Sequence, residues 1–188
     1  MAHVYLQNRV GHWADPPRFS EDVVRVAQAF WEANQTGRYA PDLKGALAMI
    51  LLRDAQGEGW ETNYKVYTPE NMQPQEAYLG RHPEIETVQA AARLRHLAGR
   101  NSGDLVLVSN YADGYYFGSP IKGTHGGLHP GDSRPALSLG WVGGDLQQVE
   151  HLRRTCQQVT DHSCSPDPQD CVSLADLMPI LRALFGWD

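Results

Sequence analysis

The sequence has 188 residues, of which 41% are hydrophobic and 20% are charged, and such proportions are ordinary for a soluble globular protein. Its formal net charge is -6 at pH 7. This excludes broad nucleic-acid binding, which needs a basic face to neutralise phosphates. No apolar run approaches the roughly 20 residues of a membrane span, so we expect no membrane partner either. The length predicts one domain over residues 1–188.

The N-terminal segment predicts a strand over residues 2–7. It has no charged n-region and no long apolar h-region, so we expect no signal peptide, and the cellular compartment stays open. A domain that enters a strand this early is typical of a fragment whose N-terminal part is missing. An edge strand that begins at residue 2 fits the same pattern.

The first half of the chain predicts one amphipathic helix and further strands. Apolar residues recur at helical spacing over residues 21–33, with Ser20 as the N-cap. The apolar run over residues 46–52 suits a buried strand and a short helix equally well. Residues 62–68 are rich in β-branched and aromatic side chains, which favours a strand.

The second half opens with the clearest α/β unit. Pro83 fits the first turn of a helix whose apolar stripe extends to Leu97, and a buried strand is expected at 104–109. A long loop over residues 110–134 and a strand over residues 135–142 follow. Long loops without internal structure are uncommon in compact domains and are often functional.

The C-terminal part combines a polar insertion with a final helix. Residues 144–171 form the insertion, and the spacing of its leucines and valine predicts a helix over residues 146–156. The last helix is expected over residues 174–185, with Ser173 as its N-cap. Pro179 lies inside that pattern and should bend the helix or delay its start.

One histidine stands in a glycine-rich segment between two predicted strands. His125 lies in the sequence Gly123-Thr124-His125-Gly126-Gly127, where glycine lets solvent and backbone approach the imidazole. We interpret it as a neutral ligand to a divalent metal, most plausibly zinc. An isolated histidine in such a loop is more often hydrogen-bonded to nearby backbone. Three neighbours extend the possible His/Asp set for zinc or manganese, although an aspartate before a strand commonly braces a turn; they are Asp113, His129 and Asp132.

A second candidate site lies in the polar insertion. Cys156, His162, Cys164 and Cys171 have the ligand types of a structural zinc site. The usual two-residue gap between paired cysteines is absent, so a disulfide in an exposed insertion is at least as compatible with this spacing. Three free thiols also fit, because an odd number of cysteines leaves one unpaired.

The long loop also carries three adjacent aromatic residues, Tyr115, Tyr116 and Phe117. They have the chemistry to stack on a substrate base, but such clusters more often anchor a loop in the core. Neither a Gly-x-Ser-x-Gly elbow nor a phosphate-binding Gly-x-x-x-x-Gly-Lys-Ser/Thr loop occurs. The sequence therefore offers no convincing nucleophile.

Five short motifs follow one another in the second half of the chain. They are Gly103-Asp104-Leu105-Val106-Leu107-Val108, Gly114-Tyr115-Tyr116-Phe117, Gly123-Thr124-His125-Gly126, Asp132-Ser133-Arg134 and Val172-Ser173-Leu174-Ala175-Asp176-Leu177-Met178-Pro179. Their succession resembles the C-terminal part of the alkaline phosphatase superfamily. Within it, the type I phosphodiesterases and nucleotide pyrophosphatases look most similar.

The resemblance implies an α/β fold with a mixed, largely parallel sheet and flanking helices, as in the C-terminal portion of an alkaline-phosphatase-like core. It implies a two-metal hydrolase of phosphate esters with zinc or another divalent metal as cofactor. His125 matches the family's last metal-ligand histidine. No residue of this chain matches the family's nucleophile or its other ligands, so we expect the chain alone to be inactive.

Two other functions stay open. The sequence also fits a non-catalytic relative that acts as a binding or structural module, and a small domain with a Cys/His structural zinc site. A phosphate ester is the small-molecule ligand that the resemblance implies. If part of a larger core is missing, we expect self-association or a partner chain to cover the exposed sheet edges.

Overall fold

The computed structural model describes residues 1–85, 89–118, 127–129, 143, 145–160 and 177–186. The chain divides into two compact units, residues 1–134 and residues 135–188, and each is described by itself. The expected single domain over residues 1–188 stays a prediction. Among the described residues, no helix is long and apolar enough to cross a membrane.

The described strands of the first unit form one sheet in the order β1-β5-β2-β3-β4. Every neighbouring pair in this sheet is antiparallel. The centre is the β2–β5 pair, in which Leu52 lies opposite Leu105 and Leu47 lies opposite Ser109. The strands are β1 (Ala2–Val4), β2 (Leu47–Leu52), β3 (Lys65–Tyr67), β4 (Met72–Pro74) and β5 (Leu105–Ser109).

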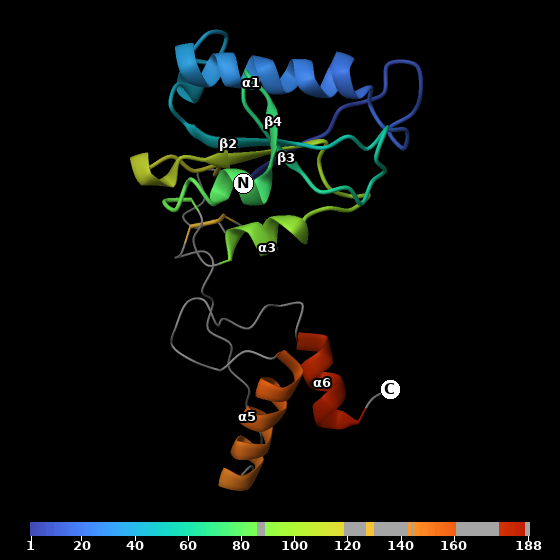
Figure 1. Cartoon of the computed structure of the whole chain (residues 1–188), viewed down its shortest axis with the longest axis vertical. Coiled ribbons are helices and arrows are strands. Elements are labelled where there is room, and N and C mark those ends of the chain that lie inside the picture. The colour runs from blue at the N-terminus through green and yellow to red at the C-terminus, as the bar shows by residue number, and fades with distance from the viewer. Residues whose placement is uncertain (86–88, 119–126, 130–142, 144, 161–176, 187–188) are drawn as a thin grey trace. The chain divides into compact units, whose positions relative to one another are not determined.

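The predicted mixed, largely parallel sheet of an alkaline-phosphatase-like portion is therefore wrong for the described residues, because their sheet is antiparallel. Continuous apolar runs such as β2 and β5 are typical of parallel strands, since helices cover both faces of a parallel sheet. Here helices cover both faces of an antiparallel sheet (Figure 1). The same apolar runs arise without parallel pairing.

The helices of the first unit divide between the two faces of the sheet. α1 packs on one face, and α2 and α3 pack on the other (Figure 1). The sheet thus forms the middle of three layers. The helical segments described in this unit are the π-helical turn η1 (Phe19–Val23), α1 (Val24–Thr36), α2 (Gln75–Leu79), α3 (Ala90–Arg95) and the 3-10 turns η2 (Pro41–Leu43) and η3 (Tyr111–Asp113).

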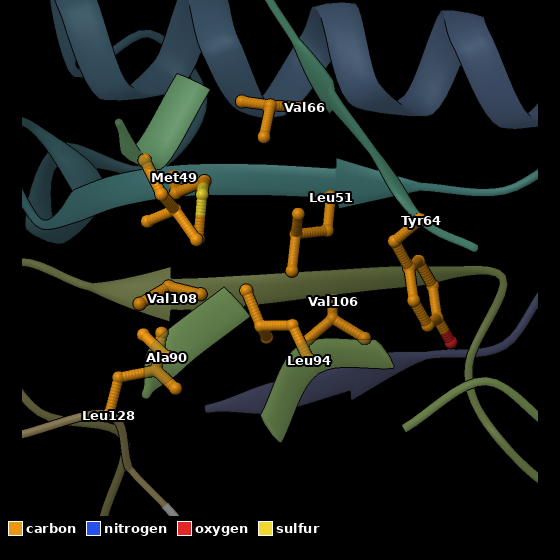
Figure 2. Packing of buried hydrophobic residues seen from close by; sticks show 10 residues of the cluster. Met49, Leu51, Tyr64, Val66, Ala90, Leu94, Val106, Val108 and Leu128 are labelled. Atoms are coloured by element: carbon orange, nitrogen blue, oxygen red, sulfur yellow. The ribbon is translucent and has the colours of Figure 1, made fainter. Parts of the chain in front are cut away.

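Alternation along the strands sends side chains into a different core on each face. On β5, Leu105 and Leu107 join the cluster beneath α1, whereas Val106 and Val108 join the cluster beneath α2 and α3. This is the period-two pattern of a strand. Figure 2 shows the second cluster, where Leu128 lies beside Ala90 and Val108.

Most predicted elements of the first unit are confirmed with tighter bounds. The strands expected at 2–7, 62–68 and 104–109 appear as β1, β3 and β5, and the ambiguous run at 46–52 is the strand β2. The helix expected at 21–33 is α1, which begins through η1. The strand expected at 135–142 lies outside the described residues. Residues 69–82, for which the sequence analysis predicts neither a helix nor a strand, contain β4 and α2.

Two buried polar side chains, those of Arg53 and Tyr64, connect the end of β2 and the start of β3 to the segment before β5. The Arg53 side chain, 1% exposed, donates to the backbone carbonyls of Trp60, Gly99 and Ser102. The Tyr64 hydroxyl, from the segment before β3, donates to the carbonyl of Gly103 over 2.6 Å. These bonds give the buried Tyr64 hydroxyl and the two terminal nitrogens of the Arg53 guanidinium the partners that buried polar groups need.

The second unit contains the helices α5 (Leu146–Thr160) and α6 (Leu177–Phe185), which contact each other. They confirm the helices predicted over residues 146–156 and 174–185. α6 is described from Leu177, and residues 174–176 of the predicted helix lie outside the described residues. Ile180 is its buried residue.

Candidate ligand pocket

A pocket of about 560 Å³ opens in the first unit, where β2 begins and β5 ends. Pockets of roughly 300–1,000 Å³ suit small molecules and cofactors. Its described lining combines apolar, aromatic and polar side chains from four parts of the chain. The lining residues are Leu47, Ala48, Tyr78, His82, Glu84, Ile85, Val108, Ser109, Asn110, Tyr111, Ala112, Leu128 and His129.

The segment after β5 is held against the start of β2. The backbone N–H of Asn110 donates to the carbonyl of Ala46 over 2.8 Å. The Asn110 side-chain amide donates to the carbonyl of Gly45 over 3.2 Å and to Asp113 Oδ2 over 2.7 Å. These bonds keep residues 110–112 at the pocket and give Asp113 a structural role in bracing the turn.

The start of β2 is positioned from the opposite face by α1. Asn34 is only 9% exposed, and its side-chain amide donates to the carbonyl of Leu47 over 2.9 Å. Its Oδ1 accepts from the N–H of Leu47 over 2.8 Å. The N–H and the carbonyl of Leu47, a lining residue, are therefore both bonded to one side chain, which holds this part of the pocket lining in place.

One wall carries an aromatic pair and an acid. Tyr78, in α2, stacks on His82 with ring centroids 4.1 Å apart, and His82 Nδ1 lies 2.9 Å from Glu84 Oε1. Burial raises the pKa of the Tyr78 hydroxyl, and the charge of Glu84 acts in the same direction. A backbone hydrogen bond and then the bond to His82 hold the pKa of Glu84 below its usual range. Glu84 is thus a carboxylate that holds Nδ1 of His82 in a hydrogen bond.

The other wall contains the described end of the glycine-rich segment. The guanidinium of Arg93 donates to the carbonyl of Gly127 over 2.6 Å, and Leu128 is 3% exposed within the core beneath α3. His129 follows, and its ring lies 5.4 Å from that of Tyr111. A second aromatic–histidine pair therefore lines the pocket, contributed by η3 and residues 127–129.

The residues named from sequence have different outcomes. His125, Asp132, His162, Cys164 and Cys171 lie outside the described residues, and Cys156 lies in α5 with its side chain outside them. The proposed metal and disulfide sites therefore stay predictions. Among the side chains that the structure does describe, no group of three or more His, Cys, Asp and Glu residues is arranged to hold a metal ion.

The aromatic run after η3 separates into different environments. Phe117 packs partly buried against the cluster beneath α1, in agreement with the core-anchoring interpretation. Tyr116 is 64% exposed, and the hydroxyl of Tyr115 lies 3.4 Å from the carbonyl of Lys44. Among the described aromatics of this loop, it is Tyr111 that reaches the pocket.

Sequence reasoning missed the wall formed by Tyr78, His82 and Glu84. Part of its signal was present, since a tyrosine and a histidine stand four residues apart and a carboxylate follows two residues later, but the histidine lies beyond the end of α2. Ser109 was also missed, because a serine at the end of an apolar strand looks like an ordinary strand terminus.

Comparison with protein-family models, curated proteins and solved structures found no match to the chain. The resemblance to the alkaline phosphatase superfamily therefore rests on the five sequence motifs and stays a prediction. The site must be interpreted from its own geometry.

Proposed function

We propose that this chain is a binding module for a small, planar phosphate ester of the nucleotide class. The observation that carries the proposal is the pocket of about 560 Å³ lined by two aromatic–histidine pairs, Tyr78 with His82 and Tyr111 with His129. Aromatic faces favour planar ligands, since stacking of a base on one aromatic side chain contributes roughly 1–3 kcal/mol. The apolar residues of the lining, which include Ala48, Val108 and Leu128, suit a ring rather than a fully hydrated ion.

A phosphate group would be recognised through His82. Glu84 engages Nδ1, so Nε2 is the nitrogen that remains for a ligand. When Nδ1 carries its proton toward Glu84, Nε2 becomes a donor only in the protonated imidazolium. The described lining contains neither lysine nor arginine, so we propose His82 as the lining side chain that contacts the phosphate.

The proposal includes binding without hydrolysis by this chain alone. Metal-assisted hydrolysis of a phosphate ester would need a loaded metal site, and a catalytic zinc needs about three protein ligands. The family resemblance supplies His125 as one such ligand. We therefore expect at most weak zinc or manganese binding in a titration, and no cleavage of a nitrophenyl phosphodiester.

Calorimetric titration with adenosine 5′-monophosphate and ribose 5-phosphate tests this function. We expect the nucleotide to bind and the sugar phosphate to bind at least about ten-fold more weakly, because it lacks the stacking ring. Tyr78→Ala should weaken nucleotide binding by about ten-fold. Tyr39→Ala is the matched control, because Tyr39 is 82% exposed and lies outside the described lining.

Equal affinity for the two phosphates would contradict the role of the aromatic pairs. Turnover of the phosphodiester by the pure chain, abolished in His125→Ala, would contradict the non-catalytic reading and favour an active hydrolase. Neither result depends on knowing the natural ligand.

A further inference from the structure

We infer that Arg93 is a positioning residue of this pocket, which sets the His129 ring against Tyr111 and thereby selects for a ligand that carries a ring. Arg93 lies in α3 and is not among the described lining residues, so it acts through the segment that it holds. The inference rests on the proposed function, since it assigns one ring-binding wall of the same pocket.

The guanidinium of Arg93 holds the segment that carries His129, two residues before the histidine. Its Nη2 donates to the carbonyl of Gly127 over 2.6 Å, and hydrogen bonds from a charged donor are stronger than those between neutral groups. Leu128, the next residue, is buried in the cluster beneath α2 and α3 and lies beside Ala90 (Figure 2). Two consecutive anchors therefore determine where the backbone reaches His129.

Helical spacing explains why Arg93 can reach this segment. Ala90 and Leu94 are fully buried and define the face of α3 that lies on the sheet. Arg93 comes three residues after Ala90 and one before Leu94, so it stands at the border of that face. An arginine at such a border can pack its aliphatic part against the core while its charged end reaches a neighbouring carbonyl. The same helix thus contacts Leu128 and holds Gly127.

Tyr111, the other member of this aromatic–histidine pair, is held by separate contacts. Asn110 donates from its backbone N–H and from its side chain to the carbonyls just before β2, which ties the start of η3 to that strand. Loss of the Arg93 bond is therefore expected to release His129 and leave Tyr111 in place. The two rings, 5.4 Å apart, would lose their fixed arrangement, and a ligand ring would have to order His129 as it binds.

The expected effect concerns the ring of the ligand and not its phosphate, which the proposed function assigns to His82 on the other wall. Adenosine 5′-monophosphate and ribose 5-phosphate are titrated into the full chain and into Arg93→Ala. We expect nucleotide affinity to fall about five-fold, a part of what one stacked base contributes, and sugar phosphate affinity to change less than about two-fold. Arg93→Lys keeps a charged donor and should lose less. Arg95→Ala is the matched control, because Arg95 lies in the same helix but is bonded to Glu76.

Two further measurements test whether Arg93 acts through His129. In a His129→Gln background, Arg93→Ala should weaken nucleotide binding by less than about two-fold, since residues that act together are not additive. In the free chain, the ring signals of His129, assigned in the NMR spectrum from their loss in His129→Gln, should shift in Arg93→Ala and stay unchanged in Arg95→Ala. The NMR comparison needs no ligand.

The outcomes separate the two proposals. If the unmodified chain binds neither phosphate, the proposed function fails and the selection for a ring fails with it. If the chain binds the nucleotide and Arg93→Ala binds it equally well, the pocket function stands and the role of Arg93 is overturned. Equal weakening of both phosphates, equal loss in Arg93→Lys and Arg93→Ala, unshifted His129 signals or an undiminished effect in the His129→Gln background would also overturn it, since each describes a residue that acts by another route.

Discussion

The hydroxyl of Tyr64 gives the fold a measurable dependence on alkaline pH. It is buried, donates to the carbonyl of Gly103 over 2.6 Å, and burial raises its pKa to about 12. Tyrosine in an unfolded chain titrates near pH 10. Between these values the folded state holds the proton that the unfolded state has lost, so the free energy of unfolding decreases as the pH rises from about 10 to 12.

We therefore predict that Tyr64→Phe is less stable than the unmodified chain at pH 8, by about 1–3 kcal/mol, because the Gly103 carbonyl loses its donor. The gap should narrow at pH 11. Urea unfolding followed by circular dichroism at both pH values measures it, with the exposed Tyr39→Phe as control. A gap of the same size at both pH values would show that Tyr64 does not titrate as described.

Individual site residues were predictable only where they shared a short stretch of sequence. His129 was named because it follows the glycine-rich segment, and it lines the pocket beside Tyr111. Their partners on the other wall, Tyr78 and His82, lie about 30 residues from Tyr111 and about 50 residues from His129 in the sequence. Spacing along the chain does not predict that these two segments line the same pocket, because their contact depends on the order of strands in the sheet.

At the scale of elements, the contact between β1 and the start of β5 depends on one glycine. A Cβ on Gly103 would lie 2.9 Å from the backbone N and O of Val4 and 2.6 Å from the carbonyl oxygen of Leu105. Backbone atoms on two strands cannot both move aside, so the strands would have to separate. His3 adds to this junction, since its Nδ1 accepts from the N–H of Gly103 over 3.1 Å.

We predict that Gly103→Ala lowers the free energy of unfolding by about 1–3 kcal/mol, the range for overpacked sites. Hydrogen exchange should also accelerate at the amides of residues 3–6 more than in α1. Gly99→Ala is the matched control, because the nearest atom to its added Cβ is Ser102 Oγ at 4.0 Å. Unchanged exchange in β1 would contradict the close approach.

Elements with strong apolar patterns were predictable, and strand direction was not. Both β2 and β5 were visible as apolar runs, but a run buried on both faces is the same whether its neighbours are parallel or antiparallel. α2 and β4 were missed because they are short and largely polar. Their formation depends on packing of Leu79 and pairing with β3 rather than on local preference.

At the scale of the whole molecule, the sheet, both of its clusters and the pocket lie within residues 1–134. We predict that a chain ending at Arg134 unfolds cooperatively, with a urea midpoint close to that of the full chain, and binds adenosine 5′-monophosphate within about two-fold of it. Absence of a cooperative transition would show that the second unit is needed for the first to fold. Light scattering of both chains would also test the predicted self-association at the edges β1 and β4.

The position of β5 between β1 and β2 has a consequence for biosynthesis. Leu6 and Asp104, joined by a hydrogen bond, are 98 residues apart, which corresponds to about 5–20 s of translation at typical rates. Until β5 leaves the ribosome, β1 has no strand beside it and β2 has only β3. β5, which lies between β1 and β2, is thus the last strand of the described sheet to be synthesised, and the edges of β1 and β2 that pair with it stay unpaired until then.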